Sequence, residues 1–453
     1  MTINPKQAVY TLVVGLGKTG LSVVRYLRAL GETVIVVDSR DIPPGLATLK
    51  NSFADVEYFT GAFDVSLFVN AHRIVISPGV PLIEPALVKA RKNNIEIIGD
   101  IDLFAHEVLA PVVAITGSNG KSTVTTLLAL MATRAGLNAV ACGNIGTPVL
   151  DALDDDVELY VIELSSFQLE TLQYLPMKAA VVLNVSADHL DRYENLTAYA
   201  TSKQAIYENA EVMVVNRDDA LASGVIRTAG RKLAFTLNAP AENEFGLCQA
   251  ADDQAIFLCF GQQQLVEADQ LKIKGRHNLQ NALAALALGY AVGLSMESML
   301  AALVEFKGLP HRAQFVAEIN GVNWINDSKA TNVGATIAAL VGLPGKHVLI
   351  AGGEGKGADF SELSDVVRQH CRGVVLMGRD ASIIAAVMPD SIPVKTVTDM
   401  QAAVYAAQTM AQVGDNVLLA PACASFDMFD NFEHRGDVFI QSVENLITAG
   451  AAS

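Results

Sequence analysis

The stretch Ala-Ile-Thr-Gly-Ser-Asn-Gly-Lys-Ser-Thr at residues 114–123 follows an apolar run and begins a helical pattern. Glycines at such a turn let backbone N–H groups point towards phosphate oxygens, and the N-terminus of the next helix adds partial positive charge. Lys121 would add a point charge, and Ser122 a hydroxyl ligand for Mg²⁺. The usual G-x-x-x-x-G-K-[ST] pattern is shortened, since Ile115 stands where its first glycine would be. The stretch therefore predicts the phosphate-binding loop of an ATP-using enzyme.

The composition narrows the class of protein. The 453 residues suggest about three domains. The formal net charge of −16 argues against non-specific binding to nucleic acid or to anionic membranes, because both require clustered Lys and Arg. The five cysteines, without C-x-x-C spacing, predict reduced thiols. With no signal-peptide pattern, and with the most apolar helical stretch interrupted by glycines and serines, we expect no membrane insertion and a cytoplasmic location.

A second glycine-rich turn lies near the N-terminus. The sequence Gly-Leu-Gly-Lys-Thr-Gly at residues 15–20 follows one apolar run, and the next apolar run ends in Asp38. This matches the G-x-G-x-x-G fingerprint with an acidic residue about 20 positions on, whose carboxylate would accept from ribose hydroxyls. Taken alone, the pattern predicts an NAD-dependent dehydrogenase. Ser-Pro-Gly at residues 77–79 follows another predicted strand, where a parallel sheet binds ligands.

Apolar runs alternate with helical patterns along the chain, which predicts an α/β protein. We expect three domains in series: a Rossmann-like N-terminal domain at residues 1–97, a central P-loop ATPase-like domain at 98–307, and a C-terminal Rossmann-like domain at 308–453. Two helices, at 278–290 and 296–306, would close the central domain. The predicted strands are 9–14, 33–38, 73–76, 96–98, 112–116, 139–142, 159–164, 179–185, 212–216, 233–236, 256–260, 322–326, 348–351, 374–377 and 416–420.

Four polar residues of the central segment are candidates for chemistry. Glu163 ends a predicted strand, where it would either complete the ligand shell of Mg²⁺ or be an ordinary strand-end acid. His189 stands between two acids after another strand, and is either a ligand or a solvated capping residue. Asn144 lies in a turn and would reach a ligand or its own backbone. For Lys203, within a helical pattern, the residues alone favour a solvent-facing side chain.

The last third of the chain has three polar or glycine-rich loops, each after a predicted strand. Residues 326–332 read Asn-Asp-Ser-Lys-Ala-Thr-Asn, which would either cap a helix or bind an anion. Residues 352–357 form a second lysine-bearing glycine turn, and residues 420–427 form the third loop. Because the carboxyl ends of parallel strands meet at one edge of a sheet, we expect these loops to lie together.

These motifs, in this order, resemble those of the Mur ligases over nearly the whole chain. The motifs are Gly-Leu-Gly-Lys-Thr-Gly at 15–20, Thr-Gly-Ser-Asn-Gly-Lys-Ser-Thr at 116–123, Glu-Leu-Ser-Ser-Phe-Gln-Leu-Glu at 163–170, Asn-Val-Ser-Ala-Asp-His-Leu-Asp at 184–191, Gly-Arg-His-Asn at 275–278, Pro-His-Arg at 310–312 and Asn-Asp-Ser-Lys-Ala-Thr-Asn at 326–332. The small departures are Ser118, where the family usually has Thr, and Ser39 after Asp38. Neither removes a charged group.

The resemblance implies a reaction and its substrates. In the family, ATP phosphorylates a substrate carboxylate, and the amine of an incoming amino acid attacks the acyl phosphate. The segment Glu-Leu-Ser-Ser-Phe-Gln at 163–168 favours D-glutamate as the amino acid and UDP-N-acetylmuramoyl-L-alanine as the carboxylate. These small molecules would be the partners of a monomeric enzyme of peptidoglycan precursor synthesis.

The resemblance also assigns roles to residues. Lys121, Glu163, His189 and Lys203 would be catalytic, with Ser122 and Glu163 on one Mg²⁺ and with His189 and a carbamylated Lys203 on a second. The ATP site would comprise Gly117, Asn119, Gly120, Lys121, Ser122, Thr123, Asn278, Arg312, Asp327 and Lys329. The UDP substrate would be bound by Gly17, Thr19, Asp38, Arg40, Ser77, Gly79, Asn144 and Ser165, and D-glutamate by Thr331, Lys356, Ser425 and Phe432.

Three alternatives stay open from the sequence. A sister Mur ligase would add a different amino acid. An NAD-dependent dehydrogenase would use only the first 40 residues and leave the Lys121 loop unexplained. A nucleotide-gated binding protein would bind ATP without catalysis.

Overall fold

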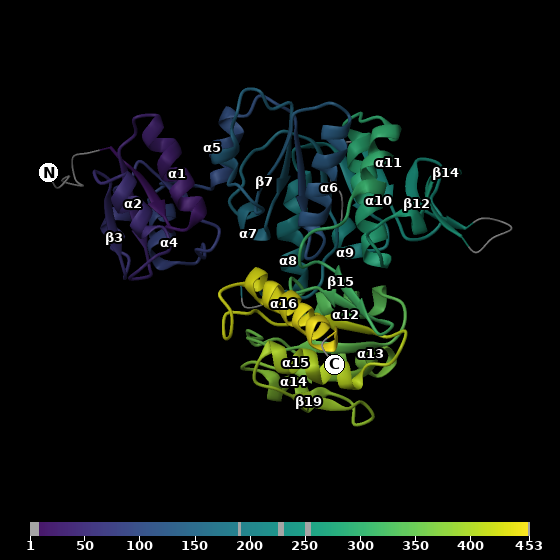
Figure 1. Ribbon diagram of the computed structural model, residues 1–453. Coiled ribbons are helices and arrows are strands. Elements are labelled where there is room, and N and C mark those ends of the chain that lie inside the picture. The colour runs from purple at the N-terminus through teal and green to yellow at the C-terminus, as the bar shows by residue number, and fades with distance from the viewer. Residues whose placement is uncertain (1–8, 189–191, 225–230, 250–254, 452–453) are drawn as a thin grey trace.

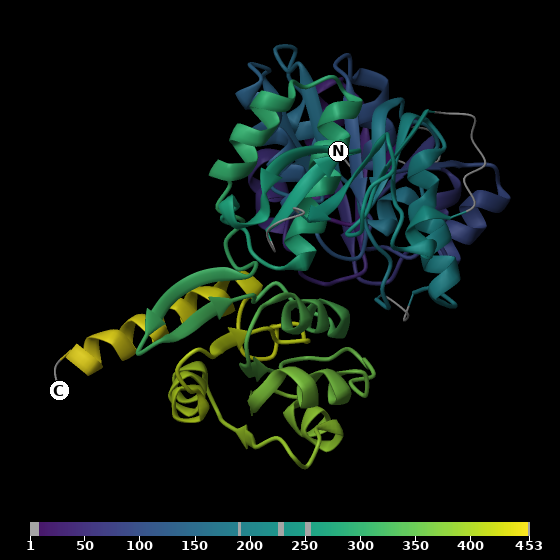
Figure 2. The same ribbon diagram turned by 90° about the vertical axis from the view of Figure 1, so that its right-hand side faces the viewer.

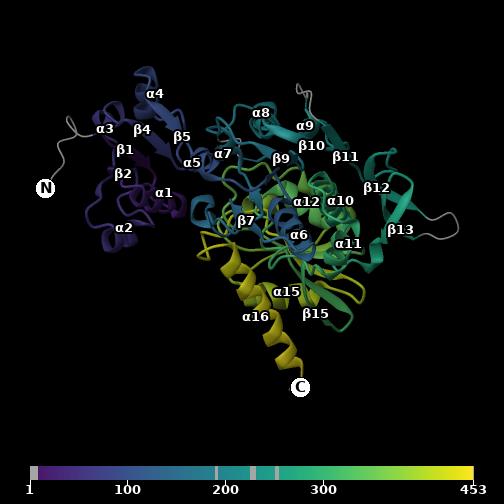
Figure 3. The same cartoon turned by 90° about the horizontal axis from the view of Figure 1, so that it is seen from above.

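The computed structural model describes residues 9–188, 192–224, 231–249 and 255–451. The chain forms three α/β domains in series, each built on its own sheet, which confirms the predicted fold class. Figure 1 shows the N-terminal and central domains side by side and the C-terminal domain below the central one. Seen from above, α5 and α7 lie on the side of the central domain that faces the N-terminal domain (Figure 3).

The N-terminal domain is a parallel sheet of order β3-β2-β1-β4-β5. Its central strands are buried along their whole length, as continuous Val and Ile runs predict. Gly20 allows the close approach of helix to turn, because a Cβ there would lie 1.9 Å from the carbonyl oxygen of Gly15. The elements are β1 (Thr11–Val14), α1 (Lys18–Ala29), β2 (Val34–Asp38), α2 (Leu46–Ser52), β3 (Glu57–Thr60), α3 (Val65–Val69), β4 (Arg73–Ile76), α4 (Pro85–Lys92) and β5 (Glu96–Ile98).

The described residues of the central domain form a sheet of nine strands in the order β14-β13-β12-β11-β10-β9-β6-β8-β7. The phosphate-loop strand β6 pairs with β8 and β9, so the loop sits at the carboxyl ends of three neighbouring parallel strands. Helices α6, α10 and α11 share an apolar core with one face of the sheet. The elements are α5 (Asp100–Glu107), β6 (Val112–Thr116), α6 (Lys121–Arg134), β7 (Ala139–Gly143), η1 (Val149–Ala152), β8 (Leu159–Glu163), α7 (Ser166–Leu169), β9 (Met177–Val182), α8 (Leu196–Gln204), η2 (Ala205–Tyr207), β10 (Ala210–Asn216), α9 (Ala220–Ser223), β11 (Arg231–Phe235), β12 (Glu244–Gln249), β13 (Ile256–Phe260), β14 (Gln263–Glu267), η3 (Ala268–Gln270), α10 (Arg276–Ala291) and α11 (Met296–Glu305).

The C-terminal domain has the order β15-β16-β20-β17-β18-β19, with β15 antiparallel and the rest parallel. The last helix, α16, runs beside β15 and extends away from the rest of the domain (Figure 2). The elements are β15 (Gln314–Ile319), β16 (Val322–Asn326), α12 (Val333–Gly342), β17 (His347–Ala351), α13 (Leu363–His370), β18 (Cys371–Leu376), α14 (Ala381–Val387), β19 (Val394–Thr396), α15 (Met400–Met410), β20 (Asn416–Leu419) and α16 (Phe432–Ala451).

The cysteines correct one expectation. Cys248 and Cys259 form a disulfide between β12 and β13, with their Cα atoms 6.2 Å apart. The prediction of reduced thiols is therefore wrong for this pair, because antiparallel pairing brings together two cysteines that are 11 residues apart. Cys142, Cys371 and Cys423 are free thiols and are buried. Within the described ranges, no helix is long and apolar enough to span a membrane.

Candidate active site

Hydrogen bonds join the phosphate loop to the segment that follows β9. The N–H of Ser118 donates to Asn184 O at 2.9 Å, and the N–H of Asn119 donates to Asn184 Oδ1 at 2.8 Å. The Ser118 hydroxyl accepts from the N–H of Ser186 at 3.0 Å and donates to its carbonyl. Ser118 thus supplies the same hydroxyl group that Thr would supply at this position. The departure from the family pattern therefore keeps the hydrogen bonds that hold the loop. Gly120 has φ +84°, which favours glycine.

Lys203, which is buried, and Lys121, which is half-buried, converge on one carbonyl of this loop. Lys121 Nζ donates to Gly117 O at 2.7 Å, and Lys203 Nζ donates to the same oxygen at 3.1 Å. Lys203 is 1% exposed, so the solvent-facing position that the residues alone favoured is wrong. Burial and then the charge of Lys121 lower the pKa of Lys203 to about 6. At neutral pH Lys203 is therefore mainly an uncharged amine.

Glu163 ends β8 beside these lysines and is 2% exposed. Its Oε1 accepts from Asn144 Nδ2 at 3.1 Å, and the Asn144 N–H donates to the Glu163 carbonyl at 2.8 Å. Its Oε2 is buried and has no hydrogen-bond partner among the described residues. An unpartnered buried carboxylate oxygen is costly unless a cation or donor meets it. Asn144 and Glu163 therefore form one unit with an oxygen available for a ligand.

Two of the predicted metal ligands are Ser122, in the first turn of α6, and Glu163, the last residue of β8. Carboxylate and hydroxyl oxygens are the ligands that Mg²⁺ prefers, so Glu163 and Ser122 fit the predicted ion. Arg312 Nη2 donates to Ser122 Oγ at 2.9 Å, so this hydroxyl already points to the opposite domain. His189 lies outside the residues that the structure describes, and among those it does describe no group of three His, Cys, Asp or Glu gathers. Of the four residues predicted to hold metal ions, Ser122, Glu163 and Lys203 therefore lie within the described part of the chain.

A cavity of about 300 Å³ lies between the central and C-terminal domains, next to the phosphate loop. Burial raises the pKa of Asp327 to about 6, and Arg312 opposes this. Burial lowers the pKa of Arg312, while Glu163 and Asp327 raise it. The cavity wall includes seven of the predicted ATP residues: Asn119, Gly120, Thr123, Asn278, Arg312, Asp327 and Lys329. Lys121 follows the lining residue Gly120 in the chain, and Ser122 adjoins the wall through its contact with Arg312.

Several cavity residues were not predicted. Asn281 lies one helical turn after Asn278, and its Nδ2 donates to Asn278 Oδ1 at 3.3 Å. A Cβ on Gly120 would lie 2.3 Å from Asn281 Oδ1, so this amide covers the phosphate loop. Burial and then Arg312 lower the pKa of His277 to about 4, which keeps it neutral. The i, i+3 spacing of Asn278 and Asn281 was the available signal for the second amide. The other unpredicted polar lining residues are Asn184, Ser186, Asp219 and Gln280.

The three C-terminal loops lie together, as predicted. The N–H of Ala422 donates to Ala330 O at 2.9 Å, and the N–H of Gly352 donates to Pro421 O at 2.9 Å. Lys329 Nζ lies 3.7 Å from the centroid of the Phe432 ring. Burial and then Arg312 lower the pKa of Lys329 to about 8.

The amino-acid residues predicted in these loops differ in exposure. Thr331 and Lys356 are exposed, whereas Ser425 is 2% exposed. Arg435 was not predicted: it is buried and donates to Ser328 Oγ, Ser328 O and Cys423 O, which ties two of the loops to α16.

The N-terminal residues gather where the strand order reverses, between β1 and β4, the usual place for a ligand in such a sheet. Asp38 accepts from the N–H of Leu16 at 2.7 Å and pairs with Arg40 at 2.6 Å. Burial alone would raise the pKa of Asp38, but the Arg40 and Leu16 donors outweigh it and lower the pKa. Arg40 is half exposed and is thus the member of the pair that faces outward.

The remaining predicted substrate residues divide between the two domains. Ser77 Oγ donates to Gly15 O at 3.1 Å, which joins the 77–79 turn to the first glycine turn. Gly17 precedes α1, Thr19 lies in its first turn, and Gly79 is exposed in the loop after β4. Ser165 caps α7 in the central domain, where its hydroxyl accepts from the N–H of Gln168 at 3.2 Å.

Known proteins match this chain along its length. The Mur ligase MurD-like N-terminal domain matches residues 9–99, the Mur ligase middle domain 115–289, and the Mur ligase glutamate ligase domain 311–423. The protein named UDP-N-acetylmuramoylalanine--D-glutamate ligase from Nitrosococcus oceani is 51% identical over 98% of this chain and 99% of the relative. The protein of that name from Pseudomonas aeruginosa is 51% identical over 96% of this chain and 98% of the relative.

Solved structures share the fold. UDP-N-acetylmuramate-alanine ligase MurC from Thermotoga maritima covers 97% of this chain and 100% of its own, with a TM-score of 0.59 and 19% identity. MurF from Acinetobacter baumannii covers 97% of this chain and 93% of its own, with a TM-score of 0.59 and 18% identity. With three successive domain matches and half of its residues identical to curated relatives over nearly its full length, the chain belongs to the Mur ligase family.

Proposed function

We propose that this protein is an ATP-dependent ligase that joins D-glutamate to UDP-N-acetylmuramoyl-L-alanine, with release of ADP and phosphate. The relatives that are 51% identical over nearly the whole chain carry the name of this activity. The enzyme works in the cytoplasm, as a monomer, in peptidoglycan precursor synthesis. The structural observation that carries the proposal is the convergence of Lys121 and Lys203 on Gly117 O, beside the unpartnered oxygen of Glu163.

The first step is phosphoryl transfer. A carboxylate oxygen of the L-alanyl group attacks the γ-phosphorus of ATP, the bond from that phosphorus to the β,γ-bridging oxygen breaks, and ADP leaves. Lys121 and the N–H groups of the phosphate loop stabilise negative charge on the transferring group. Arg312, half-buried beside the loop, adds a second fixed positive charge from the C-terminal domain. Asn278 and Asp327 hold the adenine and ribose side of ATP.

The second step forms the amide bond. The amine of D-glutamate attacks the acyl carbon, and the resulting tetrahedral intermediate expels phosphate as the amine loses its proton. Thr331 and Lys356 bind the α-carboxylate of D-glutamate, and Ser425 and Phe432 lie at its side-chain carboxylate. Lys329 lines the ATP cavity and lies against the Phe432 ring, which supports a role for its charge at the reacting centre.

The metal site follows from the same residues. Mg²⁺ bound there would neutralise phosphate charge, with Ser122 and Glu163 holding one ion and His189 and Lys203 a second. Lys203 serves as a carbamate: its neutral amine adds carbon dioxide and loses a proton, which converts a buried, uncharged amine into an anionic oxygen ligand. The adjacent charge of Lys121 disfavours the ammonium form of Lys203 and favours the carbamate.

The UDP moiety binds in the N-terminal domain at Gly17, Thr19, Arg40, Ser77 and Gly79. Asp38 acts there through Arg40, which it orients. The reactive carboxylate then reaches Asn144 and Ser165 in the central domain. Asn144 donates to Glu163 and so lies directly beside the predicted metal.

An amino-acid panel tests this proposal. Phosphate release is measured with ATP, Mg²⁺ and UDP-N-acetylmuramoyl-L-alanine, and D-glutamate, L-glutamate, L-alanine and meso-diaminopimelate are supplied one at a time. We expect phosphate release when D-glutamate is supplied and none with the other three amino acids. Turnover of UDP-N-acetylmuramate with L-alanine, and none with the expected pair, would identify a sister ligase instead. ATP binding with neither ADP formation nor amide product would favour a nucleotide-gated binding protein.

A further inference from the structure

Arg192 lies at the boundary between the N-terminal and central domains. Its Nη1 donates to Pro78 O at 3.1 Å and its Nη2 to Val80 O at 3.4 Å, both in the loop after β4. Nη2 also lies 2.7 Å from Glu170 Oε2 in the central domain. The two side chains are only 14% and 17% exposed, so this ion pair is shielded from solvent. One guanidinium therefore joins a loop of the first domain to a carboxylate of the second.

The central domain fixes the orientation of this guanidinium. Its Cζ lies 4.1 Å from the centroid of the Phe167 ring, in α7. The Tyr193 ring stacks on Phe167 with an interplanar angle of 16°, and its hydroxyl donates to Glu170 Oε1 at 2.6 Å. Both carboxylate oxygens of Glu170 are thus engaged. The planar fork of Arg suits this arrangement of one aromatic face, one carboxylate and two carbonyls, whereas the Lys ammonium does not.

The loop that Arg192 holds is the one predicted to bind the UDP moiety. Its other side is attached to the first glycine turn, because Ser77 donates through its N–H to Val14 O and through its hydroxyl to Gly15 O. Phe167 and Glu170 belong to the segment that begins at Glu163. Arg192 therefore connects the UDP loop to the segment of chain that directly follows β8 and Glu163.

We propose that Arg192, held by Glu170 and Phe167, is a positioning residue that sets the UDP-binding loop at the distance from Glu163 that the substrate must span. The inference rests on the proposed function, since it assigns the UDP substrate to this loop. Misplacement of a bound group by about 1 Å costs as much as 100-fold in rate, which makes such a brace consequential.

Steady-state kinetics of Arg192→Ala and Arg192→Lys test the proposal. We expect the KM for UDP-N-acetylmuramoyl-L-alanine to rise about tenfold or more in both variants, while the KM values for ATP and D-glutamate stay within about twofold. Lys keeps the charge but loses the fork, so it rescues little. Because Arg192 and Glu170 act as one unit, Arg192→Ala/Glu170→Ala should be no worse than Arg192→Ala.

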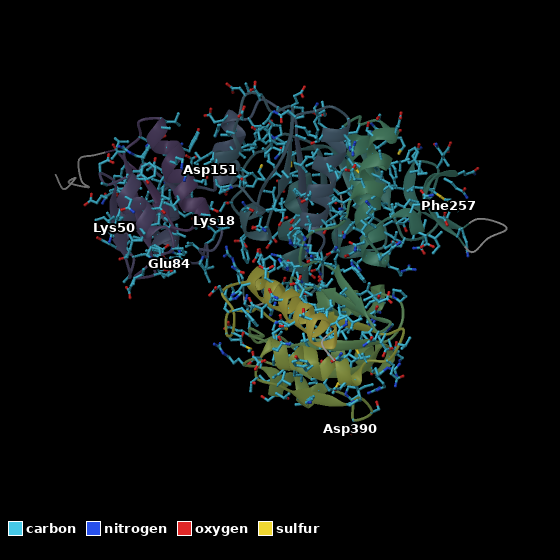
Figure 4. The ribbon with its side chains drawn as sticks, in the orientation of Figure 1. Lys18, Lys50, Glu84, Asp151, Phe257 and Asp390 are labelled. Atoms are coloured by element: carbon cyan, nitrogen blue, oxygen red, sulfur yellow. A yellow bond between two sulfur atoms is a disulfide. The ribbon has the colours of Figure 1, made fainter. Side chains whose placement is uncertain are left out.

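The matched control is Arg25→Ala. Arg25 pairs with Asp151 across the same two domains, but it is half exposed and Asp151 lies on the edge of the central domain near α1 (Figure 4). This variant should keep wild-type KM values for all three substrates. Thermal unfolding of each variant establishes that it is folded before its kinetics are compared.

Two results would overturn the positioning role: a wild-type KM for the UDP substrate in Arg192→Ala, or equal rises in all three KM values. Hydrogen exchange separates this failure from failure of the proposed function. Even if the wild-type enzyme did not turn over the expected pair, the amides of Ser77, Gly79 and Val80 should exchange faster in Arg192→Ala than in Arg25→Ala. Equal exchange in the two variants would reject the brace itself.

Discussion

The two glycine-rich turns of this chain have similar geometry and different surroundings. Both follow a buried strand and begin a helix, and each carries one lysine. In the first turn Lys18 is exposed, and the turn closes on Asp38 through the N–H of Leu16. In the second turn Lys121 is folded against Gly117 O, with Lys203 and Glu163 beside it.

The comparison separates what a glycine pattern predicts from what it does not. The pattern predicts the strand-turn-helix and the close approach of backbone to ligand. The charges buried around the turn decide the chemistry. The first turn has an acid neutralised by Arg40 and suits a passive nucleotide grip, whereas the second has two lysines and an unpartnered carboxylate oxygen and suits phosphoryl transfer.

The largest difference between the turns should appear when each loses its lysine. Lys121→Ala should lower kcat by about 10³-fold or more, because a fixed positive charge at the transferring phosphoryl group is lost. Lys18→Ala should leave the KM for ATP within about twofold, since Lys18 lies in the other domain. The rate of ADP release gives kcat and the KM for ATP in both variants. Equal losses of activity in Lys121→Ala and Lys18→Ala would remove the distinction between the turns.

The second test concerns Lys203, which has no counterpart at the first turn. Lys203→Ala should lower kcat by about 10²-fold. With its pKa lowered to about 6, the amine gains a proton as the pH falls below 6 and then no longer adds carbon dioxide. The wild-type enzyme in ¹³C-bicarbonate should show a carbamate NMR signal at pH 8 that is lost at pH 5 and is absent from Lys203→Ala. A signal that persists in the variant would arise elsewhere.

The third test uses Asp327, on the C-terminal side of the cavity. Its pKa is raised to about 6, so it is an anion at pH 8 and gains a proton as the pH falls through 6. Protonation removes an acceptor for ribose, and the KM for ATP should rise about tenfold between pH 8 and pH 5. Asp327→Asn should have the high KM at both pH values. A variant that retained the wild-type pH profile would place the titration on another group.

The smallest expected effect is a difference in stability between alanine variants of two glycines in the first turn. Gly20→Ala should lower the free energy of unfolding by about 1–3 kcal/mol, because its Cβ would meet Gly15 O at 1.9 Å. Gly17→Ala should change it by less than about 0.5 kcal/mol, since no atom lies within 4 Å of a Cβ there and its φ is negative. Urea denaturation compares them, and equal destabilisation would contradict the packing described here.

Much of the fold was predictable because its inner strands are continuous apolar runs. The predicted bounds of β4, β5, β6, β13 and β16 agree with the structure. The strands that were missed, β3, β12, β14, β15 and β19, lie at or near sheet edges. β19 is exposed throughout, and β3 is half-buried or exposed along its length. Such strands form because a neighbour pairs with them, and their sequences carry little signal of it.

The site was predictable in its loops but not in its long-range contacts. Lys203 looked like a surface lysine, and only the family resemblance marked it, because its burial depends on Gly117, 86 residues away in the chain. Arg192 has no local marker at all, since its partners come from a loop about 110 positions earlier and from α7. The same holds for Arg435, whose partners lie in two distant loops. Tertiary contacts, not local pattern, give these residues their roles.

The most direct test of the account follows one oxygen atom. UDP-N-acetylmuramoyl-L-alanine labelled with ¹⁸O in its free carboxylate is turned over with ATP and D-glutamate, and the released phosphate is analysed by mass spectrometry. Because the carboxylate attacks the γ-phosphorus at the Lys121 loop and the amine then expels phosphate, we predict one ¹⁸O in each phosphate released. Amide product accompanied by unlabelled phosphate would contradict an acyl-phosphate intermediate at this loop.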